Sequence, residues 1–113
     1  MAMNQAMEEN IFTIISCAGA ARSLCFEALE HAKKGAFDKA EESLHKAQTE
    51  LSKTHQTHTG MIQKEAAGGK HEFSLLLVHA EDHLMNTMFT KDMVKEMIEI
   101  LRRLTQVTGG KEE

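Results

Sequence analysis

The sequence predicts an all-α protein, and its composition provides the main evidence. Proline, tryptophan and tyrosine are absent, and eight of the 113 residues are methionine. β-Branched residues are thinly spread, so helix is favoured almost everywhere and strand almost nowhere. A chain of this length suits one domain. We therefore expect residues 1–113 to form a single helical domain, with flexible ends at about 1–7 and 108–113.

The first helix is expected from near Glu8 to Lys34, because Gly35 follows two lysines and glycine commonly ends a helix. Midway, the side chains shrink over Ala18–Ala21, a run that contains Gly19. Glycine within a helix costs roughly 1 kcal/mol relative to alanine, so a close backbone approach or a recess is expected there, with ordinary tight packing as the alternative. The predicted inward face consists of Ile11, Ile14, Ile15, Ala18, Ala21, Cys25, Leu29 and Ala32.

The second helix is expected to start near Phe37 or Asp38 and to end before Gly68. Asp38 is the predicted N-cap, with Glu41 three residues later at the spacing of a capping box. His58 falls on the apolar stripe, and we expect it to be a core histidine with a hydrogen-bond partner rather than a ligand. The stripe is Ala40, Leu44, Ala47, Leu51, Thr54, His58 and either Met61 or Ile62.

The third helix is expected from about Glu72 to Val107, which gives a length of ~50 Å for ~36 residues. It carries two apolar faces, which indicates neighbours on two sides. One face can pack against the other helices of an antiparallel three-helix bundle, and the other then needs partner chains. The first face is Leu75, Val78, Asp82, Met85 and Phe89; the second is Phe73, Leu77, Ala80, Leu84, Met88, Ile98 and Leu101.

Charge and cysteine content exclude several classes of protein. The net charge is −4 and no basic cluster stands apart from the acids, so a nucleic-acid partner is not expected. Cys17 and Cys25 would lie about 12 Å apart on one helix, too far for a disulfide, so both should be free thiols. We find neither an apolar run of membrane-spanning length nor a signal pattern, and we expect a cytoplasmic protein without membrane insertion.

The segment around His79 is the expected site of chemistry. Asp82 lies within the first apolar face, where a lone carboxylate needs a partner, a metal ion or a proton. His79 lies three residues earlier on the flank of that face, where its imidazole can be exposed. His79 and His83 are one turn apart and can chelate zinc, with Asp82 as a further ligand, but no matching pair is evident on another helix.

A second interpretation places Asp82 on a symmetry axis. If three copies of the third helix meet along the first apolar face, three Asp82 carboxylates converge and repel one another. A divalent cation bound by oxygen ligands would relieve this repulsion, and magnesium is the common choice. Two-fold packing with one shared proton is the alternative.

Three segments resemble the enzyme IIA components of the lactose/cellobiose family of the bacterial sugar phosphotransferase system. They are Ser74–Asn86, Gly19–Ser23 and Thr59–Ala66, and the likeness extends in order over nearly the whole chain. The resemblance implies a nine-helix homotrimer of three-helix protomers. It also implies that His79 is phosphorylated at Nε2 by the histidine phosphocarrier protein and passes the phosphoryl group to a cysteine of a IIB component. Asp82 matches the aspartate that binds a divalent cation such as Mg²⁺ at the trimer axis.

The implied function is phosphoryl transfer for uptake of a β-linked disaccharide of the cellobiose, chitobiose or lactose class. A neutral imidazole is a nucleophile at physiological pH, and its phosphoramidate suits a relay. Glu81, His83 and Arg22 are expected to support the site, with Arg22 neutralising phosphate charge. Glu81 and His58 depart from the glutamines usual in the family. The alternative is a non-catalytic helical interaction module in which His79 and His83 bind zinc or merely pack.

Overall fold

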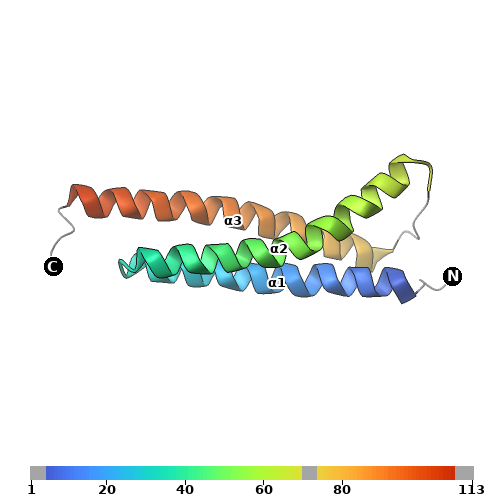
Figure 1. The fold of residues 1–113 in the computed structure, drawn as a ribbon, viewed down its shortest axis with the longest axis horizontal. Coiled ribbons are helices and arrows are strands. Elements are labelled where there is room, and N and C mark those ends of the chain that lie inside the picture. The colour runs from blue at the N-terminus through green and yellow to red at the C-terminus, as the bar shows by residue number, and fades with distance from the viewer. Residues whose placement is uncertain (1–4, 70–73, 109–113) are drawn as a thin grey trace.

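The protein folds into three long helices, as the computed structural model of residues 5–69 and 74–108 shows (Figure 1). They are α1 (Gln5–Lys33), α2 (Phe37–Ala66) and α3 (Leu75–Val107). No strand occurs within the described ranges, so the prediction of an all-α, three-helix protein is confirmed. α1 and α3 run in the same direction and α2 runs against them, within a bundle of 62 × 22 × 19 Å (Figure 1).

The helix ends agree with the sequence patterns at the glycines and differ elsewhere. Gly35 and Gly68 have φ values of +80° and +98°, which glycine adopts without strain because it has no Cβ. The predicted cap of α2 is wrong: Ala36 is the N-cap without a side-chain hydrogen bond, and Asp38 lies within the first turn, where its charge still suits the helix dipole. At α3, the hydroxyl of Ser74 accepts a hydrogen bond from the backbone N–H of Leu77, 3.1 Å away.

α1 begins earlier than expected and α3 begins at Leu75. Met7 is only 8% exposed and packs into the core, which extends α1 back to Gln5. The predicted start of α3 near Glu72 is wrong, because Ser74 has an extended backbone and caps the helix. Glu72 itself and the expected tail beyond Thr108 lie outside the described residues. The predicted lengths of the second and third helices are otherwise close to the observed ones.

The core is built on small and aliphatic side chains of α1. Its predicted inward face is confirmed except that Ile15 and Leu29 are half-buried, whereas Ala28, which was not predicted, is fully buried. On α3 the inward residues are Ala80, Leu84, Thr87, Val94 and Ile98. The prediction for Met88 is wrong, since it is exposed, and Phe73 lies outside the described residues.

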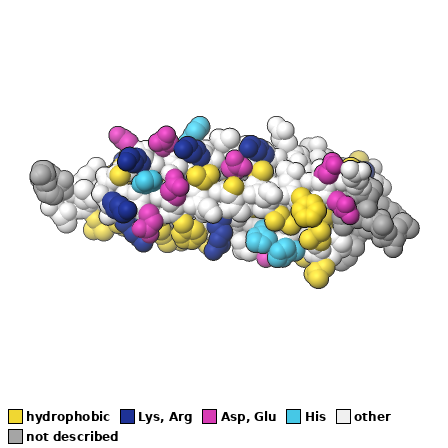
Figure 2. Space-filling model, turned by 90° about the horizontal axis from the view of Figure 1, so that it is seen from below, with side chains coloured by type: hydrophobic (Ala, Val, Ile, Leu, Met, Phe, Trp, Pro, Cys, Tyr) yellow, Lys and Arg dark blue, Asp and Glu magenta, His cyan; other side chains and the backbone are white. Residues whose placement is uncertain are grey.

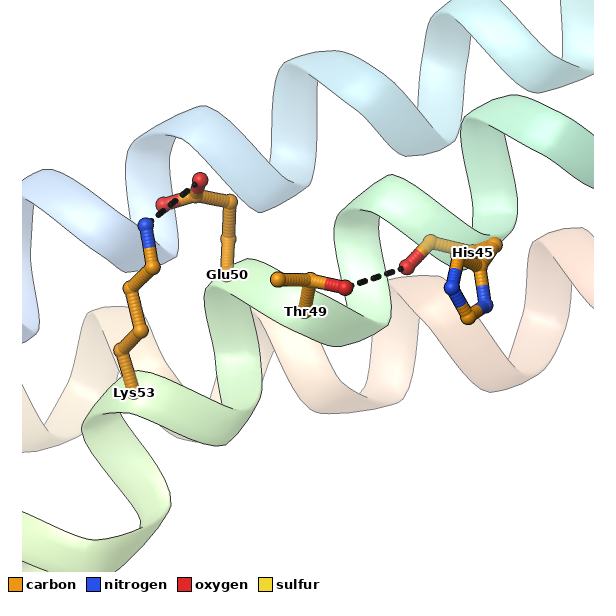
Figure 3. A network of polar contacts seen from close by, with 4 residues as sticks. All are labelled: His45, Thr49, Glu50 and Lys53. Atoms are coloured by element: carbon orange, nitrogen blue, oxygen red, sulfur yellow. Dashed lines mark hydrogen bonds and ion pairs between the residues drawn. The ribbon is translucent and has the colours of Figure 1, made fainter.

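The outward face of α2 carries polar contacts within the helix itself (Figure 3). The Thr49 hydroxyl donates to the backbone carbonyl of His45 over 3.2 Å, and the Lys53 ammonium lies 3.1 Å from the Glu50 carboxylate. A side-chain ion pair three residues apart, such as Lys53 with Glu50, contributes only about 0.2–0.5 kcal/mol. His45, Thr49 and Lys53 are exposed, whereas Glu50 is half-buried close to Cys17 of α1.

A groove of about 720 Å³ separates α2 from α3, because the two helices diverge over the second half of α2 (Figure 1). Leu51, Ile62, Leu84 and Met88 are among the apolar side chains that line it. α1 packs against both other helices and holds the bundle together.

α1 is also long and apolar enough, by composition, to cross a bilayer, which was not expected from the sequence. A core helix passes the same test, and the inward residues of α1 are buried against α2 and α3.

Candidate functional site

His79 is exposed in the second turn of α3, and the opposite face of this turn packs against the core. Ala80 and Leu84 are fully or almost fully buried and hold this turn against the core. The rings of His79 and His83 meet edge to face, with centroids 4.5 Å apart and planes at 88°. His83 is half-buried and restricts the orientation of the exposed ring. An accessible imidazole on a rigid helix is therefore present where the sequence predicted it.

The register between α1 and α3 is set by a hydrogen bond. The Thr87 hydroxyl donates to the backbone carbonyl of Ala18 over 3.3 Å, inside the core. Because α1 and α3 run parallel, Phe12 lies at about the level of the His79–His83 turn. Phe12 is 58% exposed and Leu76 is 38% exposed. Exposed apolar side chains therefore lie at about the same level of the bundle as the imidazole.

The surface view agrees with this arrangement. Figure 2 shows adjoining histidine side chains next to exposed hydrophobic ones, in the half of the molecule that holds the N-terminus. Basic and acidic side chains are interspersed over the other half of this face. An apolar surface beside a histidine is suited to contact with another protein.

Gly19 faces open space rather than another backbone of the described chain. A Cβ added at Gly19 would meet no heavy atom outside its own helical turn within 4 Å. The expected close backbone approach is therefore not present within the protomer. Gly19 and Ala20 are exposed, whereas Ala18 and Ala21 are buried, and the expectation of a recess at this run stays a prediction.

Arg22 is not brought to His79 within one protomer. Ala18 is level with Thr87, so Arg22 lies about 6 Å beyond that level and His79 about 12 Å before it, a separation of about 18 Å along the bundle. The guanidinium instead lies 5.4 Å from the centroid of the Phe26 ring. The predicted neutralisation of phosphate by Arg22 has no support from this geometry.

Asp82 lies on an exposed apolar stripe that runs the full length of α3. Within the described ranges, we find no hydrogen bond or ion pair to its carboxylate and no cluster of three or more potential metal ligands. The apolar members of the stripe are Leu75, Val78, Met85, Phe89, Met93, Met97, Ile100, Leu104 and Val107, all exposed.

His58 and Glu81 contact each other across α2 and α3. The Nδ1 atom of His58 lies 2.7 Å from Oε1 and 2.9 Å from Oε2 of Glu81, and the two side chains are 18% and 30% exposed. The prediction that His58 has a hydrogen-bond partner is confirmed. The partner was missed because it depends on how α2 and α3 are rotated against each other, which the stripes alone do not define.

Both cysteines are free, as expected, and neither offers an activated nucleophile. Burial raises the pKa of the Cys25 thiol above its usual value. Burial and then the nearby Glu50 carboxylate raise the pKa of the Cys17 thiol. Both thiols are therefore protonated at neutral pH, and the histidine segment remains the candidate for chemistry.

Comparison with known proteins gives consistent matches. Residues 9–102 match the family described as lactose/cellobiose-specific IIA subunit of the PTS system. The chain is 48% identical to the lichenan-specific phosphotransferase enzyme IIA component of Bacillus subtilis (strain 168), over 96% of this chain and 98% of that protein.

Solved structures match over most of both chains. The crystal structure of the cellobiose-specific enzyme IIA from Bacillus anthracis has a TM-score of 0.86 at 40% identity, covering 93% of this chain and 95% of that one. A solution structure of the Escherichia coli complex of IIA(chitobiose) with HPr has a TM-score of 0.75 at 37% identity, covering 87% and 95%.

Proposed function

Because the chain belongs to the lactose/cellobiose-specific IIA subunits of the phosphotransferase system, we propose that His79 is the residue that carries the phosphoryl group. The observation that carries the proposal is the exposed imidazole of His79 on a helical turn fixed by Ala80 and Leu84. Phosphoryl transfer needs chiefly positioning and in-line access, which such a turn provides.

The transfer exchanges one P–N bond for another. The lone pair of the His79 nitrogen, Nε2 by resemblance, attacks the phosphorus of a phosphohistidine on the histidine phosphocarrier protein. The P–N bond of the donor breaks, and its electron pair returns to the donor imidazole. In the second step a cysteine thiolate of a IIB component attacks, an S–P bond forms, and the electron pair of the breaking P–N bond returns to His79. No other reactant is consumed.

The donor would dock on the surface around His79 that includes Phe12 and Leu76. Support comes from their exposure and from the existence of a complex between a relative, IIA(chitobiose), and HPr. Apolar side chains around a reactive group favour docking because their burial contributes about 25 cal/mol per Å².

The exposed stripe of α3 supports a homotrimer with nine helices. A monomeric protein rarely leaves so long an apolar strip in water. The spacing of three and four residues is that of helices packed along their length, so three copies of α3 would bury one another's stripes. The remaining two helices of each protomer would then surround this central bundle.

Asp82 would bind a divalent cation, Mg²⁺ being the expected ion, at the axis of this trimer. A single carboxylate on an otherwise apolar seam supports the proposal, because three copies would supply three oxygen ligands at one level. The ion would offset the repulsion among the carboxylates. It has no part in the phosphoryl transfer itself.

We further propose a cytoplasmic protein that serves uptake of a β-linked sugar. The lichenan, cellobiose and chitobiose specificities in the names of similar proteins support this class without defining the sugar. In the proposed scheme the phosphoryl group, and not the sugar, contacts this chain.

The test is phosphorylation by the general phosphotransferase proteins and phosphoenolpyruvate. We expect an acid-labile, base-stable phosphate on the wild type and on His83→Ala, with reduced rate in the latter, and none on His79→Ala. Intact mass spectrometry at neutral pH detects the added phosphate. A wild type that stays unmodified, and binds zinc through His79 and His83 instead, would support the non-catalytic alternative.

A further inference from the structure

The contact between His58 and Glu81 joins α2 to the helix that bears the reactive histidine. Among the residues that the structure describes, two other polar contacts link these helices: Glu41 with Arg102 at 2.7 Å, and Gln48 with Lys91 at 2.5 Å. Both involve exposed side chains, whereas His58 and Glu81 are half-buried beside the groove. The pair near His79 is thus the best shielded from solvent of the three.

The segment around His79 is strongly acidic. Glu81 and Asp82 follow His79 within three residues, and a phosphoryl group on that histidine would add a charge of about −1.5 to −2. Among the described residues, His58 is the one basic side chain found in contact with either acid. Its Nδ1–H directs a positively polarised hydrogen at both carboxylate oxygens of Glu81.

Glu81 does not touch His79. Two residues along a helix correspond to a rotation of about 200°, so the carboxylate projects from the opposite flank of α3, toward α2. Its influence on the phosphoryl group is therefore electrostatic and acts over a distance on the order of 10 Å, comparable to the screening length at 0.1 M salt.

We propose that His58 is a positioning residue for the phosphoryl transfer: it holds the Glu81 carboxylate toward α2 and compensates its charge, so that His79 accepts a dianionic group more readily. The inference rests on the proposed function and adds to it a residue of another helix. It differs from a purely structural contact because the two residues have opposite effects on the rate of phosphorylation. Glu81 opposes phosphorylation and His58 removes that opposition.

The experiment compares single and double variants in the phosphorylation assay at low salt. We expect His58→Leu, which has no donor, to lower the initial rate of phosphorylation by about three- to tenfold, and Glu81→Gln not to lower it. The double variant His58→Leu/Glu81→Gln should regain the wild-type rate, because no uncompensated carboxylate remains. His58→Gln, which keeps an N–H donor, should retain most of the rate.

A matched control is His55→Leu, which changes an exposed histidine lining the same groove and should leave the rate unchanged. Thermal melting followed by circular dichroism verifies that each variant is folded. Because the effect is electrostatic, the deficit of His58→Leu should shrink at 0.5 M salt, roughly the range where screening shortens to a few ångströms.

Equal losses in both single variants, or no recovery in the double variant, would show a structural pair and overturn the inference. Unchanged rates in every variant would overturn it as well, while the proposed function would stand. If the wild type itself accepts no phosphate, the proposed function fails and the inference fails with it, a result that cannot be confused with unchanged rates.

Discussion

The two halves of α3 share their inward face and differ on their outward face. Toward the core, Ala80 and Leu84 in the first half correspond to Val94 and Ile98 in the second, and all four are buried. Toward solvent, the second half carries only apolar residues on its stripe, whereas the first half carries Asp82 between Val78 and Met85, with His79 on its flank. The first half thus adds a carboxylate and an imidazole to the outward surface without any change in the inward face.

The largest expected effect comes from a charge placed in the second half of the stripe. Ile100→Asp would bring three carboxylates together at a level with no cation and remove apolar burial. We expect the association constant of the trimer to fall by at least about a hundredfold, or ~3 kcal/mol. Light scattering at micromolar protomer concentration measures the change as a shift to monomer.

Ile62→Asp is a matched control for this variant. Ile62 on α2 is 52% exposed and Ile100 is 58% exposed, so both variants replace an isoleucine of similar exposure by the same charged residue. We expect the control to keep the size of the wild type. Should the two variants behave alike, the stripe of α3 has no special role in assembly.

The second prediction tests the similarity of the inward faces. Leu84→Ala and Ile98→Ala each remove a buried aliphatic side chain and leave a cavity, so each should lower the free energy of unfolding by about 3 kcal/mol. Urea unfolding at equal protomer concentration measures this, because the stability of an oligomer depends on concentration. A much smaller loss for one variant would mean that the core anchors only one half of α3.

The inward faces were largely predictable from the sequence, because burial follows the periodicity of apolar side chains. The positions Ile11, Ile14, Ala18 and Cys25 on α1 show this directly, since the pattern predicted them and the structure buries them fully. The exposure of His79 was also predicted, from its place on the flank of a stripe. Its proposed role came from resemblance to a family.

Contacts that depend on the rotation of one helix against another were not predictable. His58 was expected to have a partner, but nothing in the stripe of α2 indicates that Glu81 is that partner. Arg22 was expected near the phosphate, yet the level set by Thr87 and Ala18 places it about 18 Å from His79 along the bundle. A single sequence gives the face of each helix and leaves their relative levels open.

The third prediction concerns a variant in which the polar residue that distinguishes the two halves of the stripe is replaced by an apolar one. Asp82→Leu would make the first half as apolar as the second, so the trimer should persist without a cation and gain about 1–2 kcal/mol of stability per buried charge removed. We expect a chelator to lower the melting temperature of the wild type and to leave that of Asp82→Leu unchanged. Dissociation of the variant would indicate that the carboxylate makes a specific contact in the assembly.

The smallest expected effect concerns the surface of α1 beside the first half of α3. A Cβ at Gly19 and one at Gly60 would each meet open space, so Gly19→Ala and Gly60→Ala should both stabilise the protein, by about 0.5–1 kcal/mol. Thermal melting compares the two. Gly19 lies about 14 Å from His79 along the bundle, outside the docking surface proposed around Phe12 and Leu76, so neither substitution should change the KM for the phosphorylated donor. A raised KM for Gly19→Ala alone would show that the docking surface extends along α1 as far as Gly19, because an added methyl group weakens binding only where a partner approaches it closely.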